Sequence, residues 1–402
     1  MAKQIAPENV IGRDRLIAQL WKTIEKESVV FTAERRIGKT TVMKKMEAEP
    51  VAGAIVLYAD LEKVDTPVRF VETLLTDLKK HLTRRAMFTK WFGDFVESIG
   101  GTEVGGIIKI PQHGKKDWQS VLEKSLSSAC SNQPDSRLIF LWDEIPYMLQ
   151  KINALERESG SNDHSALAIL DCLRAMRNQN PKLRMIFTGS VGLHHVLAHL
   201  RGNQFASQPA NDMGKIDIGP LTPEHAAELA RDLLVCDEIQ CSSQSAVAEQ
   251  LVQLTDCVPF YIHRVVSKLA MLEGFITPAS VESEVNKCLT DHSDPWEMEH
   301  FRERLKIYYR GTVQNASGVH IETASVAKIL LNNLASASGP QSIDQCYADL
   351  KSKLPIEDRD LVIDLLKSLT YDHYLERDQD GRYSFRFALV RRWWVMAEGL
   401  NR

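Results

Sequence analysis

Nine residues near the N-terminus combine small, basic and hydroxyl side chains in the spacing of a phosphate-binding loop. They read Ala33-Glu34-Arg35-Arg36-Ile37-Gly38-Lys39-Thr40-Thr41. Gly38 lets the backbone curl so that successive N–H groups face a phosphate. Lys39 can then reach the β- and γ-phosphates as a point charge, and the Thr40 hydroxyl is placed to ligate Mg²⁺. Alanine stands where this pattern usually has its first glycine, which is a mild departure.

The residues on either side predict a strand before this loop and a helix after it. Residues 29–31 form a short apolar run, and residues 42–46 are typical of the start of a helix. Strand, turn and helix are the context that a phosphate loop needs, and the helix N-terminus adds partial positive charge. We therefore predict an ATP-binding set at Arg35, Arg36, Ile37, Gly38, Lys39, Thr40 and Thr41.

A second stretch supplies the acids that such a loop requires. Residues 137–144 read Arg-Leu-Ile-Phe-Leu-Trp-Asp-Glu, an apolar run that ends in two carboxylates and is typical of a buried parallel strand. Asp143 would hold Mg²⁺ through water, and Glu144 would polarise the attacking water. An ordinary strand ending in acids is the alternative. The order of the two motifs, about a hundred residues apart, favours ATP chemistry, with Lys39 and Glu144 as the catalytic pair.

Alternating strands and helices predict the scaffold for these residues. Apolar strands are expected at 54–60, 183–190 and 216–218, with helices between them. This alternation predicts an α/β fold with a parallel sheet that is covered on both faces. In such an ATPase sheet the strand at 183–190 lies beside the acid strand. Ser190 or Thr188 could therefore sense the γ-phosphate, although a helix cap at Ser190 fits equally well.

Two further segments belong to this predicted core. Ile11 and Gly12 precede an amphipathic helix over residues 16–24, and in P-loop ATPases of the AAA+ type such a segment packs over the adenine. A plain N-terminal helix is the alternative. Within residues 99–116, Gly100, Gly101, Gly105 and Gly106 flank short β-like pieces, and this pattern predicts a β-hairpin insertion.

The strands stop after residue 222 and four helices are expected, at 223–234, 244–254, 261–272 and 278–287. They are the usual content of a helical lid beside a nucleotide. Arg264 in the third helix could contact the γ-phosphate, and a surface arginine is the alternative. Residues 291–295 are a candidate linker.

The last hundred residues have the order of a winged helix, with helices at 324–334, 343–350 and 359–369 and a hairpin formed by 371–377 and 382–387. Five arginines lie in or near the wing, which favours contacts to DNA backbone. Neighbouring acids dilute that charge, so protein contact or autoinhibition is an equal alternative. The five arginines are Arg377, Arg382, Arg386, Arg391 and Arg392.

Trp393 and Trp394 in the final helix are expected to be core or interface residues.

Composition narrows the class of protein. The chain has 402 residues, enough for two or three domains, with 44% apolar and 25% charged residues. The net charge of −4 gives no global basic field, so a DNA-binding role needs a local patch. Seven scattered cysteines without a Cys-x-x-Cys pair fit reduced thiols in the cytoplasm. No apolar run approaches the length of a membrane span.

Taken together, the quoted motifs resemble the archaeal-type ATPases of the STAND branch of AAA+ proteins, whose relatives include the origin-recognition ATPases. The resemblance spans nearly the whole chain, and the arginine pair inside the phosphate loop is its most specific mark. It implies an ATPase core, a helical lid and a winged helix. Members act as ATP-driven switches that often assemble, and many are linked to DNA, mobile elements or defence against phage. Cys257 and Lys215 depart from residues common in the family.

We therefore expect an α/β P-loop NTPase core over 1–220, a helical lid over 221–290 and a winged-helix domain over 291–402. The expected activity is hydrolysis of ATP with Mg²⁺ by a nucleotide-dependent switch in the cytoplasm. Its expected partners are DNA through the winged helix, an effector protein, and further copies of the chain when ATP is bound; no membrane is expected. The alternative is a nucleotide-binding regulatory adaptor that hydrolyses little and controls a separate effector.

Overall fold

A computed structural model describes most of the chain, and its contacts divide it into two units, Met1–Ile218 and Gly219–Arg402. Each unit is described by itself below. The residues outside the description are 1–5, 83–91, 95, 99, 105–106, 111–116, 134, 190–191, 202–207, 315–316 and 401–402.

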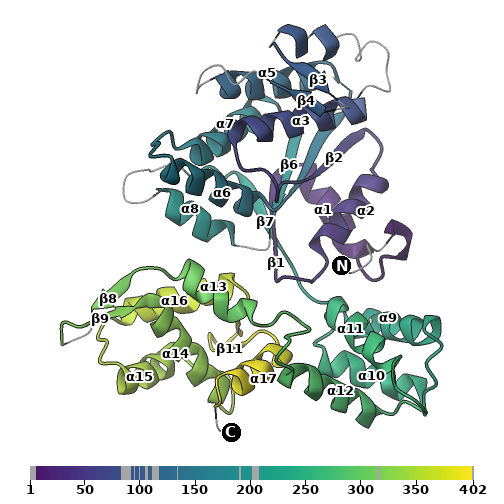
Figure 1. The fold of residues 1–402 in the computed structure, drawn as a ribbon, viewed down its shortest axis with the longest axis vertical. Coiled ribbons are helices and arrows are strands. Elements are labelled where there is room, and N and C mark those ends of the chain that lie inside the picture. Colours follow the sequence, from purple (N-terminus) through teal and green to yellow (C-terminus); the bar gives the residue numbers. More distant parts are fainter. Residues whose placement is uncertain are drawn as a thin grey trace. The chain divides into compact units, whose positions relative to one another are not determined.

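The first unit is built on a five-stranded sheet in which every described pair of neighbours is parallel (Figure 1). The strand order is β2-β5-β6-β1-β7. All carboxyl ends therefore meet at one edge, where ligands bind in sheets of this type. The expectation that the strand at 183–190 lies beside the acid strand is confirmed, since β6 pairs with β5. The strands are β1 (Ser28–Ala33), β2 (Ala54–Asp60), β5 (Arg137–Asp143), β6 (Leu183–Thr188) and β7 (Met213–Ile218).

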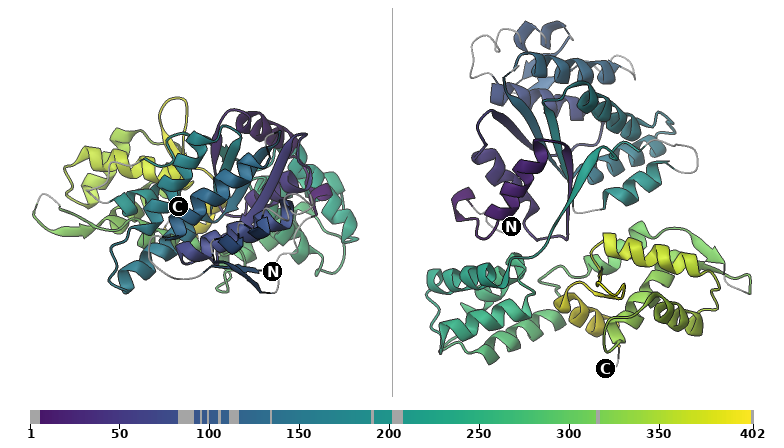
Figure 2. Two further views of the ribbon diagram at one scale, coloured as in Figure 1. Left: turned by 90° about the horizontal axis from the view of Figure 1, so that it is seen from above. Right: turned by 180° about the vertical axis from the view of Figure 1, so that it is seen from behind.

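Helices flank this sheet on both sides, as Figure 1 and Figure 2 show. Their apolar faces cover the continuous apolar runs of the strands, which is why those runs lack the alternation of a half-exposed sheet. The helical segments are η1 (Pro7–Asn9), α1 (Asp14–Ile24), α2 (Lys39–Ala48), α3 (Pro67–Leu82), α5 (Asp117–Ser131), α6 (Ile145–Glu158), α7 (Ser165–Gln179) and α8 (Leu193–Arg201).

An aromatic cluster fixes the end of β5. The Trp142 ring is 1% exposed and stacks on Phe140, with 4.9 Å between the ring centroids. Phe187 of β6 lies at 6.0 Å, and Phe70 of α3 meets the indole edge-on at 5.2 Å. Aromatic pairs of this geometry add to the stabilisation from burial. The backbone is therefore held firmly one residue before Asp143.

The predicted insertion contains a hairpin among its described residues. β3 (Thr102–Val104) and β4 (Ile107–Lys109) pair antiparallel. The Glu72 carboxylate of α3 anchors them, because it accepts a hydrogen bond from the Ile110 amide and pairs with Lys109, each at 3.1 Å. The remaining parts of the insertion, at 99, 105–106 and 111–116, lie outside the described residues.

The second unit starts with four helices, each preceded by a residue suited to begin one. Hydroxyl side chains of Thr222, Ser243 and Thr277 cap three of them, and Pro259 stands at the first position of another. The elements are α9 (Pro223–Cys236), α10 (Gln244–Leu254), α11 (Pro259–Leu269) and α12 (Pro278–Thr290), followed by α13 (His300–Tyr308) and the hairpin β8 (Thr312–Gln314) and β9 (His320–Glu322).

Three helices, a hairpin and a final helix complete this unit. They are α14 (Thr323–Ser336), α15 (Ile343–Lys353), α16 (Arg359–Tyr371), β10 (Leu375–Arg377), β11 (Tyr383–Phe385) and α17 (Ala388–Ala397). The prediction of a strand from Tyr371 was wrong, because Tyr371 still belongs to α16 and His373, with φ of +62°, turns the chain before β10. Trp393 and Trp394 are buried, so their prediction as core residues is confirmed.

Two negative findings concern the described part of the chain. No helix there is long and apolar enough to cross a membrane. All seven cysteines lie in that part and are free thiols, as the scattered spacing predicted.

Candidate functional site

The loop between β1 and α2 has the conformation that a curled phosphate loop needs. Gly38 has φ of +103°, which favours glycine, and it immediately precedes the first residue of α2. Arg36 also has a positive φ, of 71°. Arg35 is exposed and Arg36 is half-buried, while Ile37 is buried and attaches the loop to the core.

The Lys39 ammonium lies over this loop. The residue is 7% exposed, and its Nζ donates to the carbonyl oxygens of Ala33 at 3.0 Å and Glu34 at 3.2 Å. A phosphate in the loop would offer stronger, charged acceptors to the same donors. Thr41 follows in the first turn of α2 and is half-buried.

The loop and the acid strand meet directly. Thr40 Oγ1 donates to Asp143 Oδ2 at 2.6 Å, across 103 residues of sequence. Asp143 is 3% exposed, and its Oδ1 accepts from the Glu144 amide at 3.1 Å. Burial raises the pKa of Asp143, while the Thr40 bond and the Lys39 charge lower it. A hydroxyl and a carboxylate this close form an oxygen donor set that suits Mg²⁺.

Glu144 occupies the turn between β5 and α6. It is half-buried and adopts a left-handed conformation with φ of +58°. A Cβ on Gly189, just after β6, would lie 3.4 Å from Glu144 Oε2 and 2.6 Å from the Pro146 ring. The Glu144 carboxylate therefore lies close to the carboxyl end of β6, and the Pro146 ring beside it leaves no room for a side chain at position 189.

One of the two candidate sensor residues, Thr188, is the last residue of β6. Thr188 is 3% exposed and sits opposite Phe31 of β1 in the strand register. Its Oγ1 is buried without a hydrogen-bond partner among the described residues. A buried hydroxyl of this kind requires an explanation, and a ligand oxygen would supply one. Ser190, the other candidate, lies outside the described residues.

The sequence analysis missed Arg13. Ile11 and Gly12 lead into this residue, whose guanidinium is buried and donates from Nη2 to the Ile37 carbonyl at 2.9 Å. Burial lowers the pKa of Arg13 to about 10, so it is charged at neutral pH. The N-terminal segment is thereby tied to the phosphate loop. An arginine beside Gly12 was visible in the sequence, but its partner was not.

Tyr58 of β2 is a second residue that was missed. Its hydroxyl donates to Asp143 Oδ2 at 3.5 Å, the oxygen that also accepts from Thr40. Burial raises the pKa of the Tyr58 phenol, and the Asp143 and Asp60 charges raise it further, so the hydroxyl stays a donor. Its place follows from the pairing of β2 with β5.

Arg264, the predicted lid arginine, lies in α11 of the second unit. It is exposed, and its guanidinium packs 5.1 Å from the centre of the Phe260 ring. This contact of one residue with another a turn away is common on helix surfaces. The role predicted for Arg264 stays a prediction.

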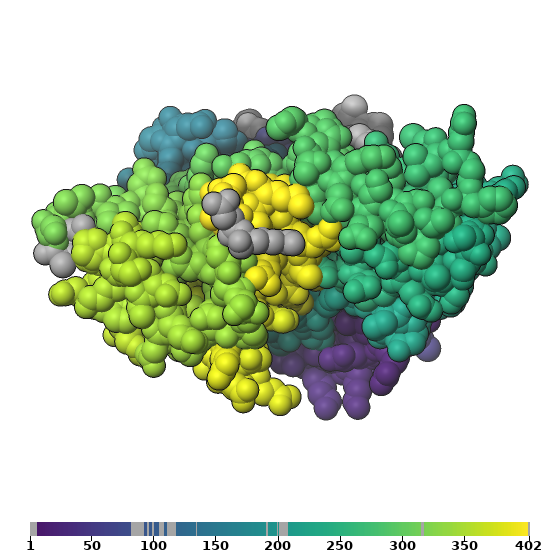
Figure 3. All heavy atoms as spheres, turned by 90° about the horizontal axis from the view of Figure 1, so that it is seen from below, coloured from purple at the N-terminus to yellow at the C-terminus, as the bar shows by residue number. Residues whose placement is uncertain are grey.

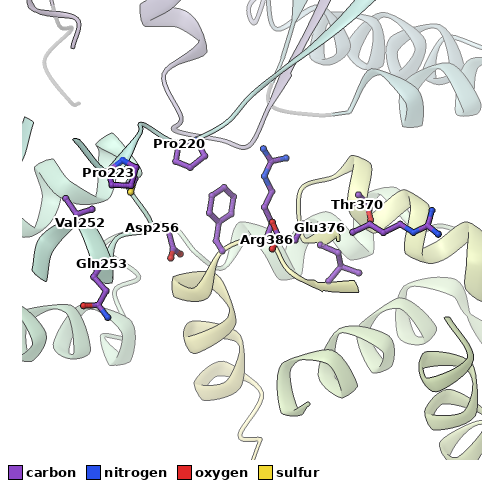
Figure 4. Close-up of a pocket in the computed structure, with 12 residues that line it drawn as sticks. Pro220, Pro223, Val252, Gln253, Asp256, Thr370, Glu376 and Arg386 are labelled. Carbon is purple, nitrogen blue, oxygen red and sulfur yellow. The ribbon is translucent and has the colours of Figure 1, made fainter. Parts of the chain in front are cut away.

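The second unit contains a cavity of about 690 Å³. Figure 4 shows Asp256, which follows α10, on one side and Glu376 and Arg386 of the hairpin segment on the other. Asp256 Oδ2 accepts from the Leu389 amide at 2.7 Å, in the first turn of α17. The four helices α9–α12 are thereby joined to the last helix of the chain.

Comparisons with known proteins add to this geometry. No protein-family model matches the chain, and no curated protein matches it. Among solved structures it is similar to the Walker-type ATPase PabY2304 of Pyrococcus abyssi, at 14% identity over 96% of each chain with a TM-score of 0.61. Weaker likenesses are the ADP form of the Aeropyrum pernix ORC2 protein (13% identity, 99% and 97% covered, TM-score 0.45) and a Thermotoga maritima RuvB mutant (10%, 96% of each, 0.39). The likeness to the Pyrococcus abyssi protein shows that the chain has the α/β fold of a Walker-type, P-loop ATPase.

Proposed function

We propose that the chain binds ATP with Mg²⁺ and hydrolyses it to ADP and phosphate. The hydrogen bond between Thr40 and Asp143 carries this proposal. It brings the hydroxyl of the phosphate loop and the acid of β5 together, beside Lys39, at the carboxyl edge of the sheet. Nucleotides bind at that edge in sheets of this type.

Each residue of the site has a role in this proposal. The loop amides and Lys39 bind the phosphates, and Thr40 and Asp143 hold the metal ion, which neutralises charge on the phosphates when it is bound. Glu144 accepts a proton from the water that attacks the γ-phosphorus, while the bond to the β-phosphate oxygen breaks. Thr188, with its unpaired buried hydroxyl, donates to the γ-phosphate.

The finer organisation is part of the same proposal. Residues 1–220 are the ATPase core, 221–290 the lid with Arg264 near the γ-phosphate, and 291–402 a winged helix. The nucleotide state sets the winged helix free or holds it, as in the STAND and origin-recognition type of AAA+ protein that the sequence resembles. DNA, in a prokaryotic defence or mobile-element setting, is the proposed target, and copies of the chain assemble when ATP is bound. The order of helices and hairpin after residue 300 supports this assignment.

One observation favours the second candidate, a regulatory adaptor that hydrolyses little and controls an effector protein. Arg377, Arg386, Arg391 and Arg392 each hydrogen-bond a group within the second unit. These guanidinium groups keep their charge, but bonds to neutral acceptors inside the unit fix them in place, so fewer of their donors are left for a DNA backbone. Arg382 is the member of the set with an exposed side chain and no such bond among the described residues.

The test is ATP binding and hydrolysis by the natural chain, Lys39→Ala and Glu144→Gln, with and without double-stranded DNA. The proposal expects turnover that DNA stimulates, and turnover lost with binding retained in Glu144→Gln. Glu158→Gln is the matched control and should keep turnover, because Glu158 is exposed at the far end of α6, the helix that begins directly after Glu144. Tight nucleotide binding that Lys39→Ala abolishes, without turnover in the natural chain, would favour the adaptor. No nucleotide binding would refute both.

A further inference from the structure

The second unit contains a recess between α14 and α17, lined by residues other than those of the larger cavity. Its volume is about 350 Å³. One wall is a single face of α17, because Ala388, Arg391, Arg392 and Val395 recur at helical spacing. The other wall is the end of α14 and the chain after it, residues 335–338, which are all alanine or serine. These small side chains leave the space open. Figure 3 shows the C-terminal segment, in yellow, at the surface.

Two guanidinium groups border this recess in fixed positions. Arg391 Nε donates to the Ala335 carbonyl at 2.9 Å, and its Nη2 donates to the Ala337 carbonyl. Arg392 Nη2 donates to Asn286 Oδ1 of α12 at 2.7 Å. Both side chains are therefore oriented by the fold before any ligand arrives, which lowers the entropy lost on binding.

Several donors of the recess are unused. Among the described residues, Arg391 Nη1 and the Nε and Nη1 groups of Arg392 make no hydrogen bond. The hydroxyls of Ser336 and Ser338 make none there either. Guanidinium forks and hydroxyls are the groups that bind phosphate oxygens in proteins.

Among the described residues that line the recess there is no carboxylate. Arg392 lowers the pKa of Asp256, which lies outside the lining and whose carboxylate accepts from the Leu389 amide at the start of α17. The recess is therefore a concave, positively charged site with unsatisfied donors, and an anion with several oxygens would complement it.

We propose that this recess binds a phosphate dianion, either free phosphate or the terminal phosphate of a small monoester. It does not depend on the proposed ATPase function. A small anion is favoured over a nucleic-acid backbone, because backbone binding needs a row of charges along a surface. The neighbouring arginines of the hairpin, Arg377 and Arg386, are instead bonded within the unit.

The experiment measures phosphate binding by titration calorimetry at constant ionic strength, in a Lys39→Ala chain so that the phosphate loop does not contribute. Probes are inorganic phosphate, phenyl phosphate and a short DNA duplex. Ala388→Glu places a carboxylate at the mouth of the recess, and an acid in the first turn of α17 is compatible with the helix. Ala388→Gln is its uncharged match. Arg392→Gln removes one donor group, and Arg382→Gln removes an exposed charge elsewhere. Circular dichroism checks that each variant folds.

The proposal expects phosphate to bind the Lys39→Ala parent, and Ala388→Glu and Arg392→Gln each to weaken binding about tenfold or more. Ala388→Gln and Arg382→Gln should stay within about threefold of the parent. Weaker binding of phenyl phosphate than of phosphate would assign the recess to the free ion, and stronger binding to a monoester. No phosphate binding by the parent, or equal binding by Ala388→Glu and Ala388→Gln, would overturn the proposal. The proposal would also be overturned if the parent chain bound the DNA duplex but did not bind phosphate, because the recess would then be part of a nucleic-acid surface.

Discussion

Replacing Asp256 with asparagine is expected to remove a pH-dependent loss of stability from the second unit. The carboxylate lies in the cavity beside α17 and accepts a hydrogen bond from the Leu389 amide. Burial raises the pKa of Asp256 from 3.8 to about 6. The Leu389 bond and the Arg392 charge lower this pKa, and the Glu376 charge raises it. The ionised form is thus less favourable in the folded chain than in the unfolded one.

The sign of the effect follows from these two values. In the unfolded chain Asp256 ionises near pH 3.8, whereas in the folded chain it ionises near pH 6. The contribution of the neutral carboxyl to stability is full below pH 3.8 and is lost as the pH rises through about 6. The total loss is about 3 kcal/mol, and about 2 kcal/mol of it falls between roughly pH 4.5 and pH 7.5.

Urea unfolding of the natural chain and of Asp256→Asn, each at roughly pH 4.5 and pH 7.5, measures how the free energy of unfolding changes with pH in the two chains. Asparagine keeps an acceptor for the Leu389 amide and does not titrate, so the variant should gain about 2 kcal/mol relative to the natural chain as the pH rises. Only the difference is read, because Asp77, whose pKa burial raises to about 7, titrates in both chains. Asp349→Asn, at an exposed position, is the control. A difference that stays constant with pH would refute the reasoning.

Three further substitutions test the phosphate loop and the strand ends. Arg13→Met removes the buried donor to the Ile37 carbonyl and should lower the free energy of unfolding by about 1–3 kcal/mol; an unchanged urea midpoint would contradict this. Gly189→Ala puts a methyl group 2.6 Å from the Pro146 ring, two residues after Glu144, so the turn that carries Glu144 must shift and ATP turnover should fall about tenfold or more while the nucleotide Kd stays within about twofold. Unchanged turnover would show that the position of Glu144 does not depend on this contact. Tyr58→Phe should raise the Mg²⁺ concentration for half-maximal nucleotide binding about two- to fivefold and leave Mg²⁺-free binding unchanged; an equal effect without Mg²⁺ would point to a structural role.

Much of the sheet could be predicted because its strands are continuous apolar runs. The strand expected at 54–60 has the bounds Ala54–Asp60 in the structure. β7 was expected only from residue 216, but it begins at Met213. The first three residues were missed because Gly214 and Lys215 interrupt the apolar pattern, as is possible in an edge strand that pairs on one side only. The three-residue strands β8 and β9 were not predicted, whereas the equally short pairs β3–β4 and β10–β11 lie in the two hairpins that were predicted from turn residues.

The sequence predicted that the phosphate loop and the acid strand act together, and the structure places Thr40 and Asp143 within hydrogen-bond distance. The candidate site could not be predicted where the role of a residue depends on tertiary neighbours. Tyr58 reaches Asp143 only because β2 pairs with β5, and strand order is not written in local sequence. Arg13 directly precedes a predicted helix, and nothing in the local sequence indicates that its guanidinium bonds to the Ile37 carbonyl of the phosphate loop.

The position of β6 has a consequence for how the chain matures during synthesis. β6 pairs with β1 on one side and with β5 on the other, so it separates the strand of the loop from the strand of the acids. Thr40 and Asp143 are both made long before Leu183–Thr188 leaves the ribosome, but their bond requires that strand to be inserted between them. Such long-range pairing is slow to form. We therefore expect that a nascent chain acquires this bond only when the strand that ends in Thr188 is in place, and that nucleotide binding would report that the first unit has been completed.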